Sequence, residues 1–102
     1  MILAFVAQVR PERLAEYKAL HAAPWREHMA VLTAAHIEDY TIHLDEPRAL
    51  LFARFTYAGS DLDADVARVD ARAWDAVTRE CLVVPEGATD AWVALPPVFR
   101  LA

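Results

Sequence analysis

The stretch that decides the fold spans residues 40–57 and reads YTIHLDEPRALLFARFTY. Apolar side chains alternate with polar ones from Tyr40 to Leu44, which is the two-residue period of a strand. Glu46–Pro47 is typical of a turn, and a second apolar run follows at Ala49–Tyr57. The stretch therefore predicts two strands paired as a β-hairpin.

Two elements are expected before this hairpin. Ile2–Val9 is an almost unbroken apolar run, which predicts a buried strand. Pro11 then suits the first turn of a helix, where its missing N–H costs nothing. Helical spacing of apolar side chains continues to about Ala35, and Pro24 inside that pattern predicts a kink near residues 20–24.

Two further elements are expected after the hairpin. A second helix is predicted from about Ser60 to Cys81, and Val98–Leu101 is predicted as a short final strand after two prolines. The order is then β-α-β-β-α-β, an α+β fold of the ferredoxin-like type. Its sheet carries both helices on one face and leaves the other face bare.

The composition predicts a partner subunit for that bare face. The 102 residues suffice for a single domain, 1–102, and 57% of them are apolar, against roughly 45–50% in ordinary soluble domains. The longest apolar stretch, Met1–Ala7, is too short to span a membrane and lacks the flanks of a signal peptide. We therefore expect a homodimer, with two sheets packed face to face as a dimeric α/β barrel.

Charge and cysteine usage exclude several classes of function. The net charge is −5 and basic residues form no stripe, so nucleic acid is not an expected ligand. The single cysteine, Cys81, suits a reducing compartment and predicts a cytoplasmic protein. One cysteine and four scattered histidines lack metal-ligand spacing, and no Gly-rich phosphate loop is present. We therefore expect no metal and no cofactor.

The first helix is the most informative element for function. Its core-facing stripe carries Tyr17, His21, Trp25 and His28, where aliphatic residues are usual. Burying a polar group without a partner costs on the order of 1–3 kcal/mol. Tyr17 and His21 are one turn apart and share a face, so they are candidates for the wall of a polar pocket between helix and sheet. The alternative is a core histidine that packing satisfies.

Three other residues are candidates for ligand contacts. Trp74, like Trp25, offers an aromatic face to a sugar or to a flat apolar ligand, although plain core packing explains it equally well. Gln8 and Arg54 are polar residues inside apolar strands. Either could bind ligand hydroxyls or form a hydrogen bond inside the dimer interface.

Several motifs along the chain resemble one known family, that of the L-rhamnose mutarotases, which are small cofactor-free sugar epimerases. The matching segments are Ala4–Val9, Pro11, Glu16–Tyr17, His21–Ala23, Trp25, Glu27, Tyr40–Asp45, Leu50–Ala53, Trp74 and Val98–Leu101. The Tyr-x-x-x-His-x-x-x-Trp spacing in the first helix is the most specific of these features. Leu20, Arg26 and Leu82 stand where family members usually carry Arg, Pro and Gln.

The resemblance implies a function and roles for particular residues. It implies a mutarotase that interconverts the α and β anomers of a 6-deoxyhexose such as L-rhamnose or L-fucose, in carbohydrate metabolism. In that family His21 would be the catalytic acid/base, Tyr17 would contact the sugar, and Trp74 would line the pocket. The resemblance also implies a dimeric α/β barrel.

Two alternatives keep the fold and change the function. A cofactor-free cyclase or isomerase of an apolar metabolite predicts an aliphatic or aromatic slot beside His21. A non-catalytic binding or dimerisation module predicts a packed His21 with no cavity next to it. Several polar groups converging near His21 would favour the sugar.

Overall fold

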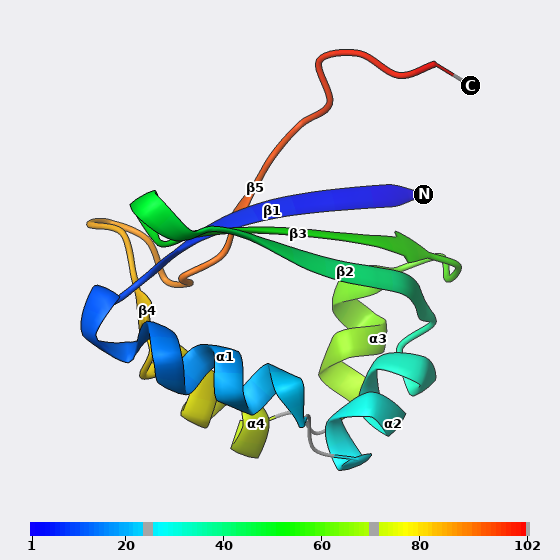
Figure 1. Ribbon diagram of the computed structural model, residues 1–102. Coiled ribbons are helices and arrows are strands. Elements are labelled where there is room, and N and C mark those ends of the chain that lie inside the picture. Colours follow the sequence, from blue (N-terminus) through cyan, green and yellow to red (C-terminus); the bar gives the residue numbers. More distant parts are fainter. Residues whose placement is uncertain (24–25, 70–71, 102) are drawn as a thin grey trace.

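One antiparallel sheet forms the platform of the molecule in the computed structural model, which describes residues 1–23, 26–69 and 72–101 (Figure 1). Its strands are β1 (Ile2–Val9), β2 (Ile37–Asp45), β3 (Leu50–Tyr57), β4 (Leu82–Val83) and β5 (Val93–Ala94). The order across the sheet is β2-β3-β1, and both β4 and β5 pair with the free edge of β1.

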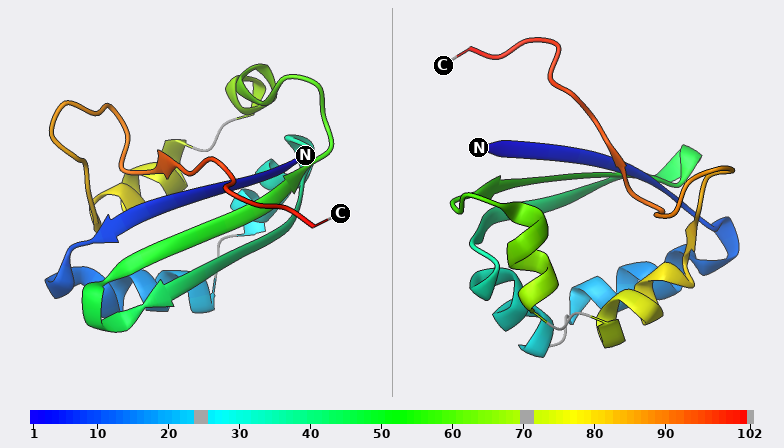
Figure 2. Two further views of the ribbon diagram at one scale, coloured as in Figure 1. Left: turned by 90° about the horizontal axis from the view of Figure 1, so that it is seen from above. Right: turned by 180° about the vertical axis from the view of Figure 1, so that it is seen from behind.

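The α-helices of the described residues lie on one face of this sheet (Figures 1 and 2). They are α1 (Leu14–Ala22), α2 (Arg26–Ala34), α3 (Leu62–Arg68) and α4 (Arg72–Arg79). Short 3-10 turns at Pro11–Arg13 and Glu46–Arg48 complete the connections. No described helix has the length and apolar character that a membrane span requires. The mixed helix-and-sheet class predicted from the sequence is confirmed.

The predicted hairpin is confirmed, and it contains a bulge that the sequence pattern did not indicate. β2 and β3 pair with Ile42 opposite Ala53, but the register shifts between Glu38 and Thr41. Asp39 sits there with φ of 48°, in the left-handed region. A bulge places two residues opposite one and re-aims their side chains. Here it puts Ile37 on the helix-covered face together with Tyr40 and Ile42, whereas strict alternation would put Ile37 on the other face.

Each of the two predicted helices is broken into two. Ala23 has φ −136° and ψ 70°, outside the helical region, as the residue before a proline usually is. Val69 is extended, with φ −101° and ψ 152°, a conformation that β-branched residues favour. The predicted kink itself falls partly on residues 24–25, outside the described residues. With these breaks, α1 lies beside α4 and α2 lies beside α3, so the helices form two pairs under the sheet (Figure 1).

The prediction of a final strand at Val98–Leu101 is wrong. The edge strand is Val93–Ala94, and its last ladder bond runs from Leu95 N to Ala4 O at 2.9 Å. Pro96 and Pro97 follow, and neither has an N–H to donate, so pairing ends there. The remaining segment leaves the sheet on the helix-free side (Figures 1 and 2).

The tightest packing lies at one end of the sheet. Val9, Leu51 and Cys81 are its largest fully buried side chains. Cys81 is a free thiol, and burial raises its pKa, so it does not have the character of a nucleophile. The opposite end of the helix-covered face is less filled, and that is where the pocket opens.

Candidate active site

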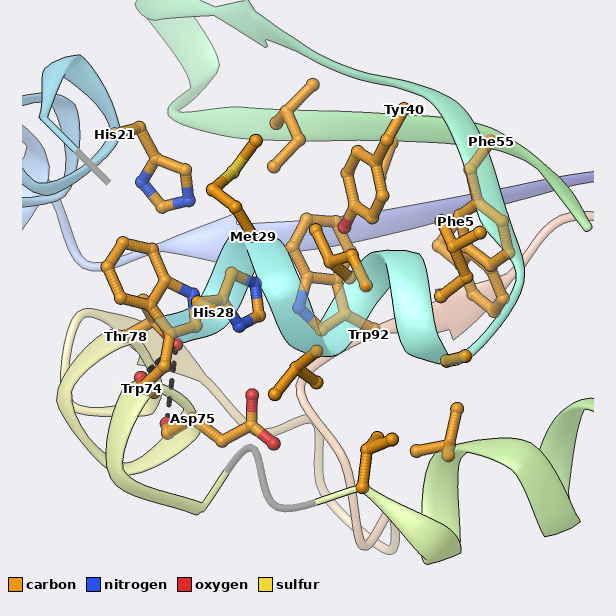
Figure 3. Close-up of a pocket in the computed structure, with 18 of the residues that line it drawn as sticks. Phe5, His21, His28, Met29, Tyr40, Phe55, Trp74, Asp75, Thr78 and Trp92 are labelled. Carbon is orange, nitrogen blue, oxygen red and sulfur yellow. Dashed lines mark hydrogen bonds between the residues drawn. The ribbon is translucent and has the colours of Figure 1, made fainter. Parts of the chain in front are cut away.

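A pocket of about 570 Å³ lies between the sheet and the helices (Figure 3). β1, β2 and β3 form its floor, and side chains from all four α-helices form its walls. Asp90 and Trp92, in the segment that leads into β5, complete the lining. This volume lies within the range of small-molecule binding sites. His21 is therefore not packed away from a cavity, contrary to what a non-catalytic module predicts.

His21 is held in a defined tautomer at the wall of this pocket. Its Nδ1 lies 3.0 Å from the backbone carbonyl oxygen of Tyr17, one helical turn earlier in α1. A carbonyl can only accept, so Nδ1 carries the proton and donates it. In the neutral imidazole, Nε2 then has the free lone pair. A lone pair fixed in this way suits a general base.

The rings around His21 form a continuous row. Tyr17 stacks on His21 with centroids 4.2 Å apart, and His21 meets the indole of Trp74 edge-on at 5.3 Å. His28, from α2, stacks on the same indole at 4.8 Å with an interplanar angle of 16°. Trp74 thus contacts two imidazoles, one edge-on and one stacked, from the two halves of the broken first helix (Figure 3).

Two tyrosines add phenol groups to the lining of the pocket. Tyr17 is only 4% exposed, and burial holds the pKa of its phenol far above its ordinary value. Tyr40 stacks on Phe55 at 5.3 Å, and burial, with a smaller effect of the Asp75 charge, raises its pKa to about 12. Both phenols therefore stay protonated at neutral pH and can donate hydrogen bonds.

Two carboxylates complete the polar end. Asp75 of α4 and Asp90 both line the pocket. Burial raises the pKa of Asp75, and the nearby charge of Asp90 raises it further. Across residues 1–23, 26–69 and 72–101, no three histidine, cysteine or acidic side chains come together as a metal site would require.

The far end of the pocket is apolar. Phe5 and Phe55 stack on the floor at 5.8 Å. Leu62, Val66 and Val69, in and just after α3, form the wall above them. The pocket therefore has a polar end around His21 and a hydrocarbon end beneath α3.

The structure brings three of the predicted site residues together and separates a fourth. Tyr17, His21 and Trp74 all line the pocket. Gln8 does not. It lies on the opposite face of the sheet, where its Nε2 donates to the carbonyl oxygens of Arg48 at 3.1 Å and Ala49 at 2.9 Å. Trp25, the fifth candidate, falls outside the described residues.

Gln8 and Arg54 share their position on the helix-free face for the same reason. Side chains alternate along a strand, so Phe5 on the pocket floor puts Gln8 on the other side. The guanidinium of Arg54 pairs there with Asp39 at 3.0 Å. Neither residue reaches the pocket.

Sequence reasoning missed His28, Tyr40, Asp75 and Asp90 as pocket residues. His28 lies on the same predicted stripe as His21, and that spacing was a usable signal. Tyr40 alternates with Ile42, which also faces the pocket. Asp75 and Asp90 carry no signal, because their positions depend on the break at Val69 and on the path of the chain before β5.

Comparison with known proteins assigns this chain to one family. The profile of the L-rhamnose mutarotase family matches residues 3–101. An L-rhamnose mutarotase of Jannaschia sp. (strain CCS1) is 32% identical over 99 residues, covering 96% of this chain and 95% of the relative. The chain belongs to the L-rhamnose mutarotase family. This is a family of carbohydrate-acting enzymes, and the family assignment made from the sequence is confirmed.

Other relatives of the L-rhamnose mutarotase family match over shorter or more distant ranges. One from Rhizobium meliloti (strain 1021) is 47% identical over 49 residues, so the chain spans 47% of that relative's length in the match. The crystal structure of an L-rhamnose mutarotase from Formosa agariphila superposes with a TM-score of 0.81. It covers 100% of this chain and 99% of its own at 23% identity, which supports the fold.

Proposed function

We propose that this protein interconverts the α and β anomers of a 6-deoxyhexose, with L-rhamnose as the first candidate and L-fucose as the second. His21 would act as the acid/base. The proposal rests on the bond from His21 Nδ1 to the Tyr17 carbonyl, which leaves Nε2 as the basic atom of a residue that lines the pocket. Membership of the L-rhamnose mutarotase family supports the choice of substrate.

The proposed chemistry needs only one proton carrier. Nε2 of His21 accepts the proton of the anomeric hydroxyl while the C1–O5 bond breaks, and O1 becomes the aldehyde oxygen. The ring oxygen O5 then accepts this proton from Nε2 and becomes a hydroxyl group. Rotation about C1–C2 and the reverse sequence give the other anomer. An imidazole is well matched to this task because its ordinary pKa is about 6.5.

The other residues would bind and orient the sugar. The phenols of Tyr17 and Tyr40 can donate to sugar hydroxyls because both stay protonated. Trp74 would line the sugar site, and the aromatic face of Trp25, predicted from the sequence, would have the same role. The carboxyl of Asp75 also lines the pocket and offers acceptors.

The direct test is the rate of anomer exchange. Saturation-transfer NMR on L-rhamnose, and on L-fucose in parallel, would compare the natural protein with His21→Ala and with the control His36→Asn. His36 is exposed and lies outside the pocket lining. His21→Ala should reduce the protein-catalysed rate by about 10²–10⁴-fold. An undiminished rate in a folded His21→Ala protein would contradict the proposal.

The apolar end of the pocket is the observation that favours the alternative, a cyclase or isomerase of an apolar metabolite. Phe5, Phe55 and the α3 side chains could hold a hydrocarbon ligand. The polar end favours the sugar, since His21, His28, Tyr40 and Asp75 all converge there. A displacement assay with an environment-sensitive hydrophobic dye separates the two functions. Displacement by sugar favours the mutarotase, and displacement only by apolar compounds favours the cyclase or isomerase.

We also propose that the protein works as a homodimer in the cytoplasm, with two sheets of ferredoxin-like order closing a dimeric α/β barrel. The helix-free face supports this, because Phe52 is 42% exposed there. Val98 and Phe99, in the segment that leaves the same side, are 102% and 82% exposed. Phe52→Asp should halve the mass measured by analytical ultracentrifugation, whereas an unchanged mass would count against this interface.

A further inference from the structure

His28 is the second imidazole of the pocket, and one of its nitrogens is unusual. Its Nδ1 is shut off from solvent and has no hydrogen-bond partner among the described residues. Its ring stacks on Trp74 at 4.8 Å, and the residue lines the pocket. A buried polar atom without a partner is uncommon in native proteins, so this one calls for a physical explanation.

The environment of His28 selects one protonation state. A buried N–H without an acceptor is rarer than a buried lone pair without a donor. Burial, together with the charge of nearby His21, lowers the pKa of His28. The ring is therefore neutral at pH 7, with the lone pair on the buried Nδ1 and the proton on Nε2.

The remaining nitrogen is the one available to a ligand. Nε2 of His28 makes no hydrogen bond to the described residues, and the residue lines the pocket. The ring lies on the side of Trp74 opposite α1, facing into the same hollow as Asp75 and Met29 (Figure 3). An N–H fixed in this way is a preorganised donor, and the indole of Trp74 contacts both this ring and that of His21.

We propose that His28 is a substrate-recognition residue, whose Nε2–H donates a hydrogen bond to a sugar hydroxyl other than the anomeric one. The inference rests on the proposed function and assigns it a specificity contact. A sugar that bridges His21 and His28 is aligned by two fixed nitrogens, one accepting at the anomeric hydroxyl and one donating elsewhere on the ring. An aliphatic side chain here would leave that hydroxyl without its donor.

The test compares two substitutions at position 28 with a histidine control elsewhere. His28→Leu fills the space without a donor, and His28→Gln keeps an N–H at a similar reach. His36→Asn is the control, since Asn tolerates the φ of 63° at that position. Calorimetry gives the Kd for L-rhamnose and for L-fucose, saturation transfer gives kcat and KM, and histidine side-chain NMR gives the tautomer of His28.

The expected result is a loss of binding with little loss of turnover. His28→Leu should raise Kd and KM about tenfold, as expected for one lost hydrogen bond, while kcat changes less than about threefold. His28→Gln should recover most of the affinity, and sugar should shift the Nε2–H resonance in the natural protein. Any of three results would overturn the inference. They are a Kd of His28→Leu equal to that of the natural protein, an equal loss of affinity in His28→Leu and His28→Gln, and a His28 tautomer with the proton on Nδ1.

The inference and the proposed function can fail separately. If L-rhamnose or L-fucose binds but no anomer exchange occurs, mutarotation is wrong, and the Kd series at position 28 still decides the role of His28. If exchange is fast and position 28 has no effect on Kd, the function stands and the recognition role is wrong. If neither sugar binds the natural protein at millimolar concentration, the role of His28 in sugar recognition is overturned.

Discussion

Two polar clusters on the same side of the sheet differ in how their hydrogen bonds are used. At the α3 end, Tyr57 donates to Asp65 and accepts from Asp61 N at 2.9 Å. Asp65 also accepts from Arg68 at 2.9 Å, and Arg68 reaches the carbonyl of Ala34 at 3.1 Å. The donors and acceptors of this Tyr57 cluster are used within the protein.

Around His21, the polar groups have atoms without hydrogen-bond partners among the described residues. His21 uses Nδ1 for its own helix and leaves Nε2, and His28 has no protein partner on either nitrogen among the described residues. The first cluster joins β3 and α3 to the end of α2, so its role is structural. The second combines unused polar atoms with a hollow, which is the combination expected of a binding site.

The largest expected effect is a loss of both stability and activity on substitution of Trp74. Trp74 is 6% exposed and contacts both pocket imidazoles. Trp74→Ala should therefore destabilise the fold by about 3–5 kcal/mol and also abolish anomer exchange. Chemical denaturation and saturation transfer on the folded fraction check the two parts. A stable variant with full activity would show that the indole neither supports the helices nor aligns the histidines.

A smaller effect, on stability alone, is expected from a substitution beside the Tyr57 cluster. A methyl group at Gly59 would overlap the Tyr57 hydroxyl and the Asp65 carboxylate. Gly59→Ala should cost about 1–3 kcal/mol of stability, the usual price of overpacking, and lower the thermal midpoint by about 4–8 °C for each kcal/mol. Exchange per folded molecule should not change. A loss of kcat at low temperature, where the variant is folded, would mean that the Tyr57 cluster also controls the site.

The smallest effect should appear in the pH dependence of stability. His28 has a lowered pKa in the folded protein, so its contribution is complete above the unfolded value of about 6.5 and is lost as the pH falls below it. His21 faces it from α1, and Asp75 and Asp90 face the pocket from α4 and the segment before β5. Asp75 acts in the opposite direction, because its pKa is raised and folding becomes more favourable as it protonates.

The measurement that isolates His28 is therefore a difference. The thermal midpoint of the natural protein relative to that of His28→Leu, taken between pH 7.5 and 5.5, should fall toward low pH, because only the natural protein loses the His28 contribution. Parallel curves would show that His28 titrates alike in the folded and unfolded chains.

The sequence predicted the parts of the site that depend on local spacing. Tyr17 and His21 are one helical turn apart and remain so in α1, and the hairpin that carries Tyr40 forms as its alternation indicates. The bulge at Asp39, the break at Val69 and the pairing of β5 depend on tertiary contacts instead. Gln8 could not be placed because both faces of β1 are apolar, so its pattern does not tell which face carries the pocket.

We propose that Nε2 of His21, an oriented imidazole nitrogen without a protein partner, marks the active site. The most direct test is L-rhamnose anomer exchange in His21→Gln, a variant that fills the same space and keeps a side-chain amide. We expect a thermal midpoint close to that of the natural protein and a catalysed exchange rate near the uncatalysed background. A folded His21→Gln protein that exchanges anomers at the natural rate would contradict it.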